Sequence, residues 1–508
     1  MKYLTEADRS DAQRPLIARR DFLGALACGG AGILSPDFAI AASCEAPQPE
    51  PFGQIVSRLS PVIRLYGAGA AAIEGSAELD KLKISISSSG SAEMIWNVTA
   101  QHTGDFQVFL SYAAPRDGIR LKIVCGRSAV SQSLPATQGV YLTNPNFQRI
   151  QLQGKLRLNC GVNPVKLRLA SEDSSTRLHV RCLELIPSSA AAGVDSSAMR
   201  AVAHGANTDW LANAGYGVMF HWTDFSQPQH GPQKSYQEAV KAFAVAPFAE
   251  MVEGTGAAYV IFTVDHAHPH CPAPIQSWER IHPGWTTRRD LIGEIAAELE
   301  RRDIRLFLYI NSPTLGKLNF SRPAVIGQPT YSEEQYLEIH KHVLTEIGQR
   351  YGQRVAGYWF DSWYQSLEAY PDIPFEKLYG FTKAGNPRRI TAFNFWIFPV
   401  LTEWQDYWAG ELNRLQNPFL ARTIQHGAGK GFQAHGLITM LPSWVHNKPG
   451  PMPPPQFGAD DLIQYVEANA AQKAATTINI GIYQEGTISD ESRRMMDQLR
   501  RAIRAHGR

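Results

Sequence analysis

The stretch VAGYWFDSWYQ, residues 355–365, ends a run of strand-forming, mostly apolar residues on a single carboxylate, Asp361. Its neighbours in sequence are largely aromatic. Aspartate is depleted in strands and costly to bury. A carboxylate in this setting is therefore either a structural acid with satisfied hydrogen bonds or an acid that takes part in a reaction.

Other polar and aromatic side chains also follow or interrupt apolar, strand-like runs in the C-terminal part of the chain. They are His221, Trp222, Asp265, His266, Asn311, Trp359, Asn394, Trp396 and Trp444. Sugar rings have apolar faces and polar edges, which suit a pocket of aromatic rings with a few carboxylates and imidazoles. These residue types predict a carbohydrate site.

The charge balance and the absence of certain motifs exclude several other partners. The 49 Lys and Arg residues nearly cancel the 47 Asp and Glu residues, so no broad field favours nucleic acid or an acidic membrane. No Gly-rich phosphate loop follows any predicted strand, and we expect no organic cofactor and no metal. The expected partner is a neutral carbohydrate.

The elements that must position these groups alternate between strand and helix from residue 209 onward. Strands are predicted at 216–222, 257–266, 305–312, 355–361, 389–395, 419–425, 437–444 and 476–483. Helices are predicted at 235–254, 287–303, 332–352, 402–415, 461–475 and 490–507. This alternation predicts a (β/α)8 TIM-type barrel over residues 209–508, with a doubly wound open sheet as the alternative.

The N-terminal part of the chain has a different organisation. Adjacent Arg19 and Arg20 precede an apolar run, 22–34, which is too short to span a membrane, and an A-x-A-like site lies at 39–41. We interpret residues 1–41 as a twin-arginine-type export signal, which predicts a periplasmic or extracellular protein.

A β-sandwich is predicted to follow the signal. After a Pro-rich linker, 42–55, short alternating strands over 56–188 predict a jelly-roll-like sandwich, and residues 189–208 read as a second linker. The sandwich is a candidate carbohydrate-binding domain, with a purely structural role as the alternative.

Four motifs of the C-terminal part resemble the alpha-L-fucosidase family, glycoside hydrolase family twenty-nine. GYGVMFHW, AAYVIFTVDHAH, RRDLIGEIAAELERRDIRLFLYINS and YGQRVAGYWFDSW occur in the family's order and spacing between residues 209 and 368. The family carries similar F-x-H-W-G, T-x-K-H-H-D-G, R-D-x-x-x-E and W-F-D-G motifs. The resemblance weakens toward the C-terminus.

The resemblance implies a retaining glycosidase mechanism. Asp361 would be the nucleophile that forms a covalent glycosyl-enzyme. Glu411, predicted in a helix, is the first candidate for the acid/base, Glu403 the second and Glu485 the third. The positions of His221 and His266 imply hydrogen bonds to the sugar, and Trp222 fits a stacking wall.

The chain departs from the family pattern at several positions. Asp265 stands where the family has the first histidine of its pair, and Ala267 and His268 replace the following D-G. Ser362 replaces the glycine of W-F-D-G. The sandwich stands in front of the barrel, whereas the family usually places one behind it.

Two other functions compete with a glycosidase. DHAHPHC brings five candidate metal ligands close together, which would suit a metal-dependent hydrolase: Asp265, His266, His268, His270 and Cys271. A non-catalytic glycan-binding protein would keep the aromatic pocket without needing a second carboxylate. The prediction is an exported, two-domain, retaining exo-glycosidase that releases terminal fucose or a related sugar from a glycan.

Overall fold

The computed structural model describes residues 54–55, 62–79, 86–114, 116–137, 140–141, 144–145, 148–170, 177–317, 331–363, 366, 369–370, 373–394, 402–413, 415, 422–423 and 431–505. The export signal predicted at 1–41 and the side chain of Trp396 lie outside these residues and stay predictions. Among the described residues, no helix is both long and apolar enough to cross a bilayer.

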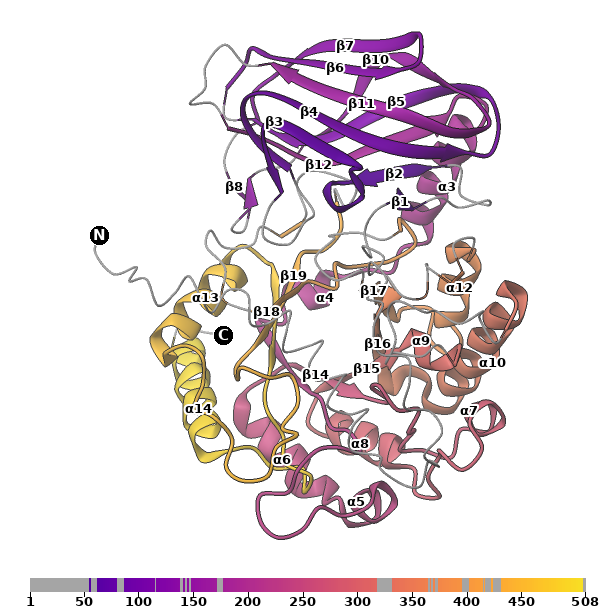
Figure 1. Cartoon of the computed structure of the whole chain (residues 1–508). Coiled ribbons are helices and arrows are strands. Elements are labelled where there is room, and N and C mark those ends of the chain that lie inside the picture. Colours follow the sequence, from indigo (N-terminus) through magenta and orange to yellow (C-terminus); the bar gives the residue numbers. More distant parts are fainter. Residues whose placement is uncertain are drawn as a thin grey trace, which may run out of the picture.

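The N-terminal unit, residues 54–187 and called the front unit below, is built from antiparallel strands (Figure 1). They are β1 (Gln54–Ile55), β2 (Ile63–Tyr66), β3 (Ala72–Leu79), β4 (Ile86–Ala100), β5 (Gly104–Ala113), β6 (Ile119–Cys125), β7 (Ser128–Leu134), β8 (Val140–Tyr141), β9 (Asn144–Pro145), β10 (Gln148–Leu158), β11 (Gly161–Ala170) and β12 (Arg177–Pro187). Strand β11 pairs with β4 and β6, and β12 pairs with β2, β4 and β5.

The alternating residues of these strands enclose one apolar core. In β6 every second side chain is buried, and its inward residues join those of β4, β5 and β11 around Trp96. One face of each strand is therefore apolar and the other polar, as expected for antiparallel sheets with one covered face. The antiparallel sheets predicted from the sequence are confirmed; the jelly-roll topology stays a prediction.

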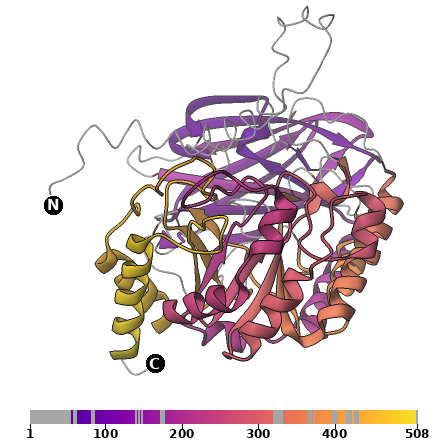
Figure 2. The same cartoon turned by 90° about the horizontal axis from the view of Figure 1, so that it is seen from below.

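The second unit contains eight described parallel strands in one curled sheet with helices outside it, an arrangement consistent with a TIM-type barrel (Figure 2). Its strands are β13 (Tyr216–Phe220), β14 (Tyr259–Thr263), β15 (Arg305–Asn311), β16 (Val355–Asp361), β17 (Ile390–Phe393), β18 (Glu411–Asn413), β19 (His435–Thr439) and β20 (Ala475–Asn479). They pair in the order β17-β16-β15-β14-β13-β20-β19-β18, so each described strand pairs with its chain neighbour except at the β17 and β18 ends.

The helices of this unit lie on the outer face of the sheet, except the first, whose Leu211 joins the apolar cluster inside the sheet. They are α4 (Asp209–Ala212), α5 (Tyr236–Ala242), α6 (Val245–Thr255), α7 (Gln276–Ile281), α8 (Leu291–Glu300), α9 (Ser312–Leu315), α10 (Glu333–Tyr351), α12 (Phe375–Thr382), α13 (Ala459–Ala471) and α14 (Asp490–Ala505). Both faces of the strands are buried: outward residues such as Phe262 and Phe360 pack under the helices, and inward ones such as Phe307 fill the interior. Nearly continuous apolar runs in the sequence follow from this double burial.

The predicted helix 402–415 is wrong in the residues that the structure describes, whereas the strand predicted at 419–425 lies mostly outside them and stays a prediction. Residues 402–410 are extended and irregular, and β18 begins at Glu411. Trp404, Tyr407 and Trp408 have helix-like spacing, but each packs in a different apolar cluster. An extended chain reaches three clusters at once, whereas one helical face would not.

Hydrogen bonds from this segment close the sheet between β17 and β19. Backbone N–H of Asp406 donates to Thr391 O at 2.8 Å, and Leu437 N donates to Gly410 O at 2.7 Å. The carboxylate of Asp406 accepts a further bond from Thr391 N at 2.8 Å. The segment thereby holds Glu411 beside the strands of the curled sheet.

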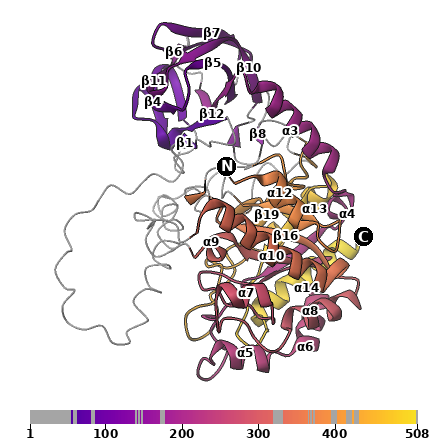
Figure 3. The ribbon, with the colours of Figure 1, turned by 90° about the vertical axis from the view of Figure 1, so that its right-hand side faces the viewer.

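The residues predicted as a second linker contain a helix, α3 (Ala191–His204), which runs from the front unit toward the second (Figure 3). Arg200 of α3 pairs with Glu376 of α12 at 2.8 Å. Trp404 Nε1 donates to Ser197 Oγ at 3.1 Å. The connection between the units is therefore fastened to the second unit.

Replacing Gly410 by alanine should destabilise the protein. Gly410 has φ +64°, and an added Cβ would lie 1.9 Å from the carbonyl oxygen of His435, which is backbone and cannot move aside. We expect a loss of about 2–4 kcal/mol in the free energy of unfolding, measured by thermal and denaturant unfolding.

The matched control is Gly380→Ala in α12, where an added Cβ would meet no atom within 4 Å. Alanine is the better helix former, so this variant should unfold at the same or a higher temperature. Equal unfolding midpoints for the two variants would contradict the packing argument.

Candidate active site

The carboxyl ends of β13 to β17 bring the predicted site residues to one end of the curled sheet. Asp361 is the last residue of β16 and lies in register with Asn311, the last residue of β15. His221 directly follows β13, Asp265 lies two residues beyond β14, and Asn394 directly follows β17. This is the end at which barrel enzymes carry their active sites.

Asp361 is held by hydrogen bonds from three neighbours. The Tyr309 hydroxyl donates to Oδ2 at 2.5 Å, and Oδ1 accepts from Asn394 Nδ2 at 2.8 Å and from Ser362 N at 2.7 Å. The side chain is 2% exposed. Because a buried carboxylate needs such donors in place of water, the three bonds fix its position and its charge.

The backbone at Ser362 explains why the family pattern has glycine there. Ser362 has φ +61°, a left-handed conformation that costs a residue with a side chain about 1–2 kcal/mol. The turn aims its N–H at the carboxylate of Asp361. A glycine would adopt this turn without that cost.

A second carboxylate, Glu411, lies close to Asp361. Asn394 Nδ2 donates to Glu411 Oε2 at 2.6 Å and also to Asp361 Oδ1 at 2.8 Å. The two carboxylate oxygens are thus no farther apart than the sum of these two lengths. Glu411 is 3% exposed and begins β18, so the predicted solvated helix position is wrong for this residue.

Tyr309 is a site residue that the sequence prediction missed. Its ring stacks on Trp359 with centroids 5.3 Å apart, and its oxygen lies 2.7 Å from His266 Nδ1. When Asp361 is ionised, the single phenol proton is donated to it, so the phenol oxygen accepts from Nδ1–H of His266. The available signal was strand periodicity, because Tyr309 lies two residues before Asn311 and faces the same side.

His221 lies against the same group. Its ring centroid is 4.8 Å from that of Tyr309 and 5.2 Å from that of His266, with Trp444 at 5.4 Å on another side. Asn479 Nδ2 donates to Trp444 O, so its Oδ1 accepts from Nδ1–H of His221 at 3.2 Å. The structure thus brings both predicted histidines and half-buried Trp444 together.

Two predicted tryptophans lie elsewhere. Trp222 is 1% exposed in the core beneath the helices, where its Nε1 donates to Gln484 O. Trp359 is 2% exposed inside the curled sheet, and its Nε1 donates to Ala409 O. The predicted sugar-stacking role is therefore wrong for Trp222, because its ring lies in the core between the strands and the helices. Trp359 instead stacks on the ring of Tyr309.

The other acid/base candidates face different partners. Burial lowers the pKa of the Arg64 guanidinium in β2, but the negative charge of Glu184 and, more weakly, that of Glu403 contribute to a net rise. Glu485 accepts a hydrogen bond from Gln229 N at 3.1 Å. Glu411 is the candidate that shares a hydrogen-bond donor with Asp361.

Asp265 is buried at the same strand ends. It is 2% exposed, and its Oδ1 accepts from Asn311 N at 2.9 Å. Burial raises the pKa of Asp265 to about 8, the bond from Asn311 opposes this rise, and the negative charge of Asp361 adds to it. The residue that replaces a family histidine is therefore a carboxyl group that favours its neutral form.

The loop after β14 makes a strained turn. His268 N donates to His266 O at 2.7 Å around Ala267, whose φ is +62°. His268 Nδ1 lies 2.7 Å from Asp224 Oδ2. This hydrogen bond raises the pKa of His268, which favours an imidazolium–carboxylate pair.

The candidate metal ligands of this loop have protein partners, and both His268 Nδ1 and His270 Nε2 approach Asp224 Oδ2, at 2.7 and 3.7 Å. His266 bonds to Tyr309, His268 bonds to Asp224, and the ring of His270 stacks on Tyr236 at 4.2 Å. Nowhere in the described part of the chain do three or more His, Cys, Asp or Glu residues form a group that could hold a metal ion. The geometry therefore gives the metal-dependent alternative no support.

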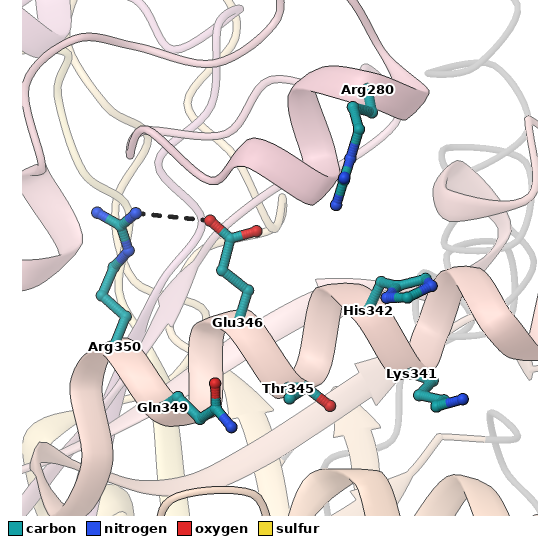
Figure 4. A pocket seen from close by; sticks show the side chains of 7 residues that line it. All are labelled: Arg280, Lys341, His342, Thr345, Glu346, Gln349 and Arg350. Atoms are coloured by element: carbon teal, nitrogen blue, oxygen red, sulfur yellow. Dashed lines mark hydrogen bonds and ion pairs between the residues drawn. The ribbon is translucent and has the colours of Figure 1, made fainter.

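A separate groove of about 550 Å³ lies between α7 and α10 (Figure 4). Its lining residues are Arg280, Lys341, His342, Thr345, Glu346, Gln349 and Arg350. Glu346 accepts bonds from Gln276 N and Ser277 N, both at 2.7 Å. This groove carries none of the strand-end residues described above.

Comparison with known proteins agrees with the motifs. The family model described as alpha-L-fucosidase matches residues 193–508. The chain belongs to the alpha-L-fucosidase family. The suspected resemblance is thereby confirmed, and the match extends well beyond residue 368 to the end of the chain.

Individual relatives are distant. The chain is 29% identical to tissue alpha-L-fucosidase of Mus musculus over 132 residues, which cover 20% of this chain and 29% of that protein. The corresponding protein of Homo sapiens is 28% identical over 132 residues, covering 20% of this chain and 28% of that one. The matched stretch thus spans less than a third of these relatives.

A solved alpha-L-fucosidase of family GH29 from Bacteroides thetaiotaomicron is similar to this chain at 16% identity. The similarity covers 59% of this chain and 76% of that one, with a TM-score of 0.44.

The His268–Asp224 pair should stabilise the protein at low pH and less at high pH. Because the folded-state pKa of His268 is raised, the stabilisation is fully present below the ordinary pKa, about 6.5, and is lost as the pH rises through the folded-state pKa. The His268 side chain is 40% exposed, so solvent screening limits the coupling to about 0.5 kcal/mol. A double-mutant cycle of Asp224→Asn and His268→Gln, followed by thermal unfolding at pH 5.5 and 9, measures it.

The matched control is His342→Gln, because His342 is exposed and lies 3.8 Å from Glu338. Its effect on unfolding should be small at both pH values. A larger Asp224–His268 coupling at pH 9 than at pH 5.5 would show that the pair is not an imidazolium–carboxylate contact.

Proposed function

We propose that the protein is a retaining exo-glycosidase that hydrolyses terminal alpha-L-fucose, or a closely related sugar, from a glycan. One observation carries this proposal: a single amide, Nδ2 of Asn394, donates to both Asp361 and Glu411. Two buried carboxylates within reach of one amide group are the functional groups that glycoside hydrolysis requires.

Asp361 is the nucleophile in this proposal. Its Oδ atom attacks the anomeric carbon, the bond to the leaving oxygen breaks, and a covalent glycosyl-enzyme forms. The Tyr309 hydroxyl and the Ser362 N–H hold the carboxylate in one orientation before the attack. Pre-positioning of this kind lowers the entropic part of the barrier.

Glu411 is the acid/base. Its protonated form gives a proton to the leaving oxygen, and its carboxylate then takes a proton from the water that attacks the glycosyl-enzyme. The shared donor Asn394 limits the distance between the nearest oxygens of Asp361 and Glu411, and this short distance supports the retaining pathway. Carboxyl groups lie about 5–5.5 Å apart in retaining enzymes and about 6.5–9.5 Å apart in inverting ones.

The sugar would lie among His221, His266 and Trp444. The imidazoles offer polar atoms for hydroxyl groups, and the indole offers an apolar face for the ring. Fucose is the first sugar to test, because the alpha-L-fucosidase family model matches residues 193–508, which include the whole second unit. The aglycone is a glycan in this proposal.

A non-catalytic glycan-binding protein is the alternative of another class. It would need aromatic and polar contacts but no second carboxylate beside Asp361. The hydrogen bonds of Asn394 to both Asp361 and Glu411 therefore favour an enzyme, because they place the second carboxylate that only a hydrolase needs.

Removal of Asp361 and removal of Glu411 should each stop turnover, but at different steps of the reaction. Asp361→Asn should lower kcat on 4-nitrophenyl alpha-L-fucoside by at least about 1,000-fold, because no glycosyl-enzyme forms. Glu411→Ala should still release 4-nitrophenol, which leaves without an acid, but should stall at the glycosyl-enzyme. Azide, a nucleophile that needs no base, should restore turnover and yield a fucosyl azide of retained configuration.

Glu403→Ala is the matched control and should keep its activity within about threefold, because the charge of Glu403 acts on Arg64 of β2 and Glu403 does not share the Asn394 donor with Asp361. If azide restored turnover in the Glu403 variant but not in the Glu411 variant, the acid/base would be Glu403 instead of Glu411. Binding of fucosides without turnover by both the parent chain and Asp361→Asn would favour the glycan-binding alternative.

Tyr309→Phe should slow the reaction without unfolding the protein. It removes the hydroxyl that donates to Asp361 but keeps the stacking on Trp359. A hydrogen bond to a charged group is worth about 1.5–3 kcal/mol, so kcat/KM should fall by about 10- to 100-fold. Steady-state kinetics at pH 6–7 measures the effect.

Tyr407→Phe is the control for this change. It removes a buried hydroxyl that donates to Tyr358 O at 2.9 Å deeper in the sheet, so it should reduce stability by about 1 kcal/mol and leave kcat/KM within threefold. Equal kinetic losses in both variants would mean that Tyr309 acts only through packing.

A further inference from the structure

Asp265 and Asn311 carry two buried oxygen atoms that lack donors. Oδ2 of Asp265 and Oδ1 of Asn311 are both inaccessible to solvent and form no hydrogen bond with any described residue. The two residues are already joined, because Oδ1 of Asp265 accepts from Asn311 N at 2.9 Å. Each buried acceptor without a donor is costly, and one proton shared by the two residues would give both oxygens a hydrogen bond.

The charged groups around Asp265 favour such a proton. Asp361 on β16 adds negative charge, and Tyr236 on α5 and Cys271 in the loop after β14 are neutral groups that also interact with Asp265. The Thr314 hydroxyl of α9 acts as a weak hydrogen-bond donor that opposes the rise in the pKa of Asp265, but its geometry falls outside the limits of an ordinary hydrogen bond. Burial dominates and keeps the pKa of Asp265 at about 8.

Asn311 links this carboxyl group to the nucleophile. It is the register partner of Asp361 at the ends of β15 and β16, and it is 1% exposed. A residue that holds both the N–H and the amide oxygen of Asn311 therefore fixes the strand end next to Asp361. If Asp265 instead became charged, a second buried negative charge would lie near the attacking carboxylate.

We propose that Asp265 is a neutral carboxylic acid in the working protein and a positioning residue: Oδ1 accepts from Asn311 N while the proton on Oδ2 is donated to Asn311 Oδ1. This arrangement holds the end of β15 beside Asp361 and keeps a second charge away from it. It also accounts for an acid at the position where the family pattern has a histidine, because a neutral carboxyl and an imidazole can each donate one hydrogen bond.

Infrared spectroscopy of the full chain tests the protonation directly. At pH 6–7 the spectrum should contain the carbonyl band of a buried protonated carboxyl, which should disappear with a midpoint near pH 8. The band should be absent from Asp265→Asn and unchanged in Thr314→Val, which removes the nearby hydroxyl. If the Asn variant does not fold, Asp265→Ser, a smaller residue with a hydroxyl donor, takes its place. A spectrum without an Asp265-dependent band would overturn the proposal.

Thermal unfolding gives a second readout that is independent of activity. The folded-state pKa of Asp265 is raised, so between about pH 4 and 8 the folded chain binds more protons at this site than the unfolded chain. The stability of the parent chain therefore falls through this window, and Asp265→Asn should lack that part of the decline. Parallel curves of unfolding temperature against pH for the two proteins would also overturn the proposal.

The kinetic test rests on the proposed function. On 4-nitrophenyl alpha-L-fucoside, kcat/KM of the parent chain should fall above about pH 8. Asp265→Asn, whose amide keeps one acceptor and one donor for Asn311, should hold its own pH 7 value of kcat/KM to at least one pH unit higher than the parent chain does. A loss as large as that of Asp361→Asn would mean that the charged form is needed and would overturn the inference. Absence of fucosidase activity in the parent chain would refute the function instead, and the infrared result would still decide the state of Asp265.

Discussion

The burial of one carboxylate sets the main constraint on this structure. Asp361 is nearly inaccessible to water, so its charge must be stabilised by protein donors, and these come from the neighbouring strand ends and from the next backbone N–H. Tyr309 and Asn394 reach it only if β15, β16 and β17 lie in parallel and in register. The register of these three strands and the stabilisation of the negative charge of Asp361 therefore depend on each other.

Asp406 is a further buried acid, and its hydrogen bonds hold several segments of the chain together. It accepts bonds from Ala206 N, Thr391 N, the Tyr379 hydroxyl and the Lys383 ammonium. These donors come from the segment after α3, from β17 and from α12. By collecting them, Asp406 fixes the extended segment that carries Glu411 toward Asn394, so the fold places the second carboxylate through contacts far from the reaction.

Much of the fold was predictable from the sequence. Strands buried on both faces give unbroken apolar runs, and helices with one covered face give three- and four-residue spacing, which located β13 to β17, β19 and β20 and helices such as α10 and α14. The helix predicted around Trp404 and Trp408 was wrong, because side chains with helical spacing packed in separate clusters. Local periodicity carries no information about which cluster a side chain will join.

The sequence by itself determined that Asp361 ends a buried strand in aromatic surroundings, and that a histidine follows each of two other strands. The tertiary structure alone decided which groups meet. Glu411 is 50 positions from Asp361 in the chain, and the two share one amide donor because the segment before β18 bonds to β17 and brings Glu411 to Asn394. Trp222 fits a sugar wall by type, yet its ring points into the core. Residue type and spacing fix what a side chain can do, but direction and proximity depend on contacts between segments that are distant in sequence.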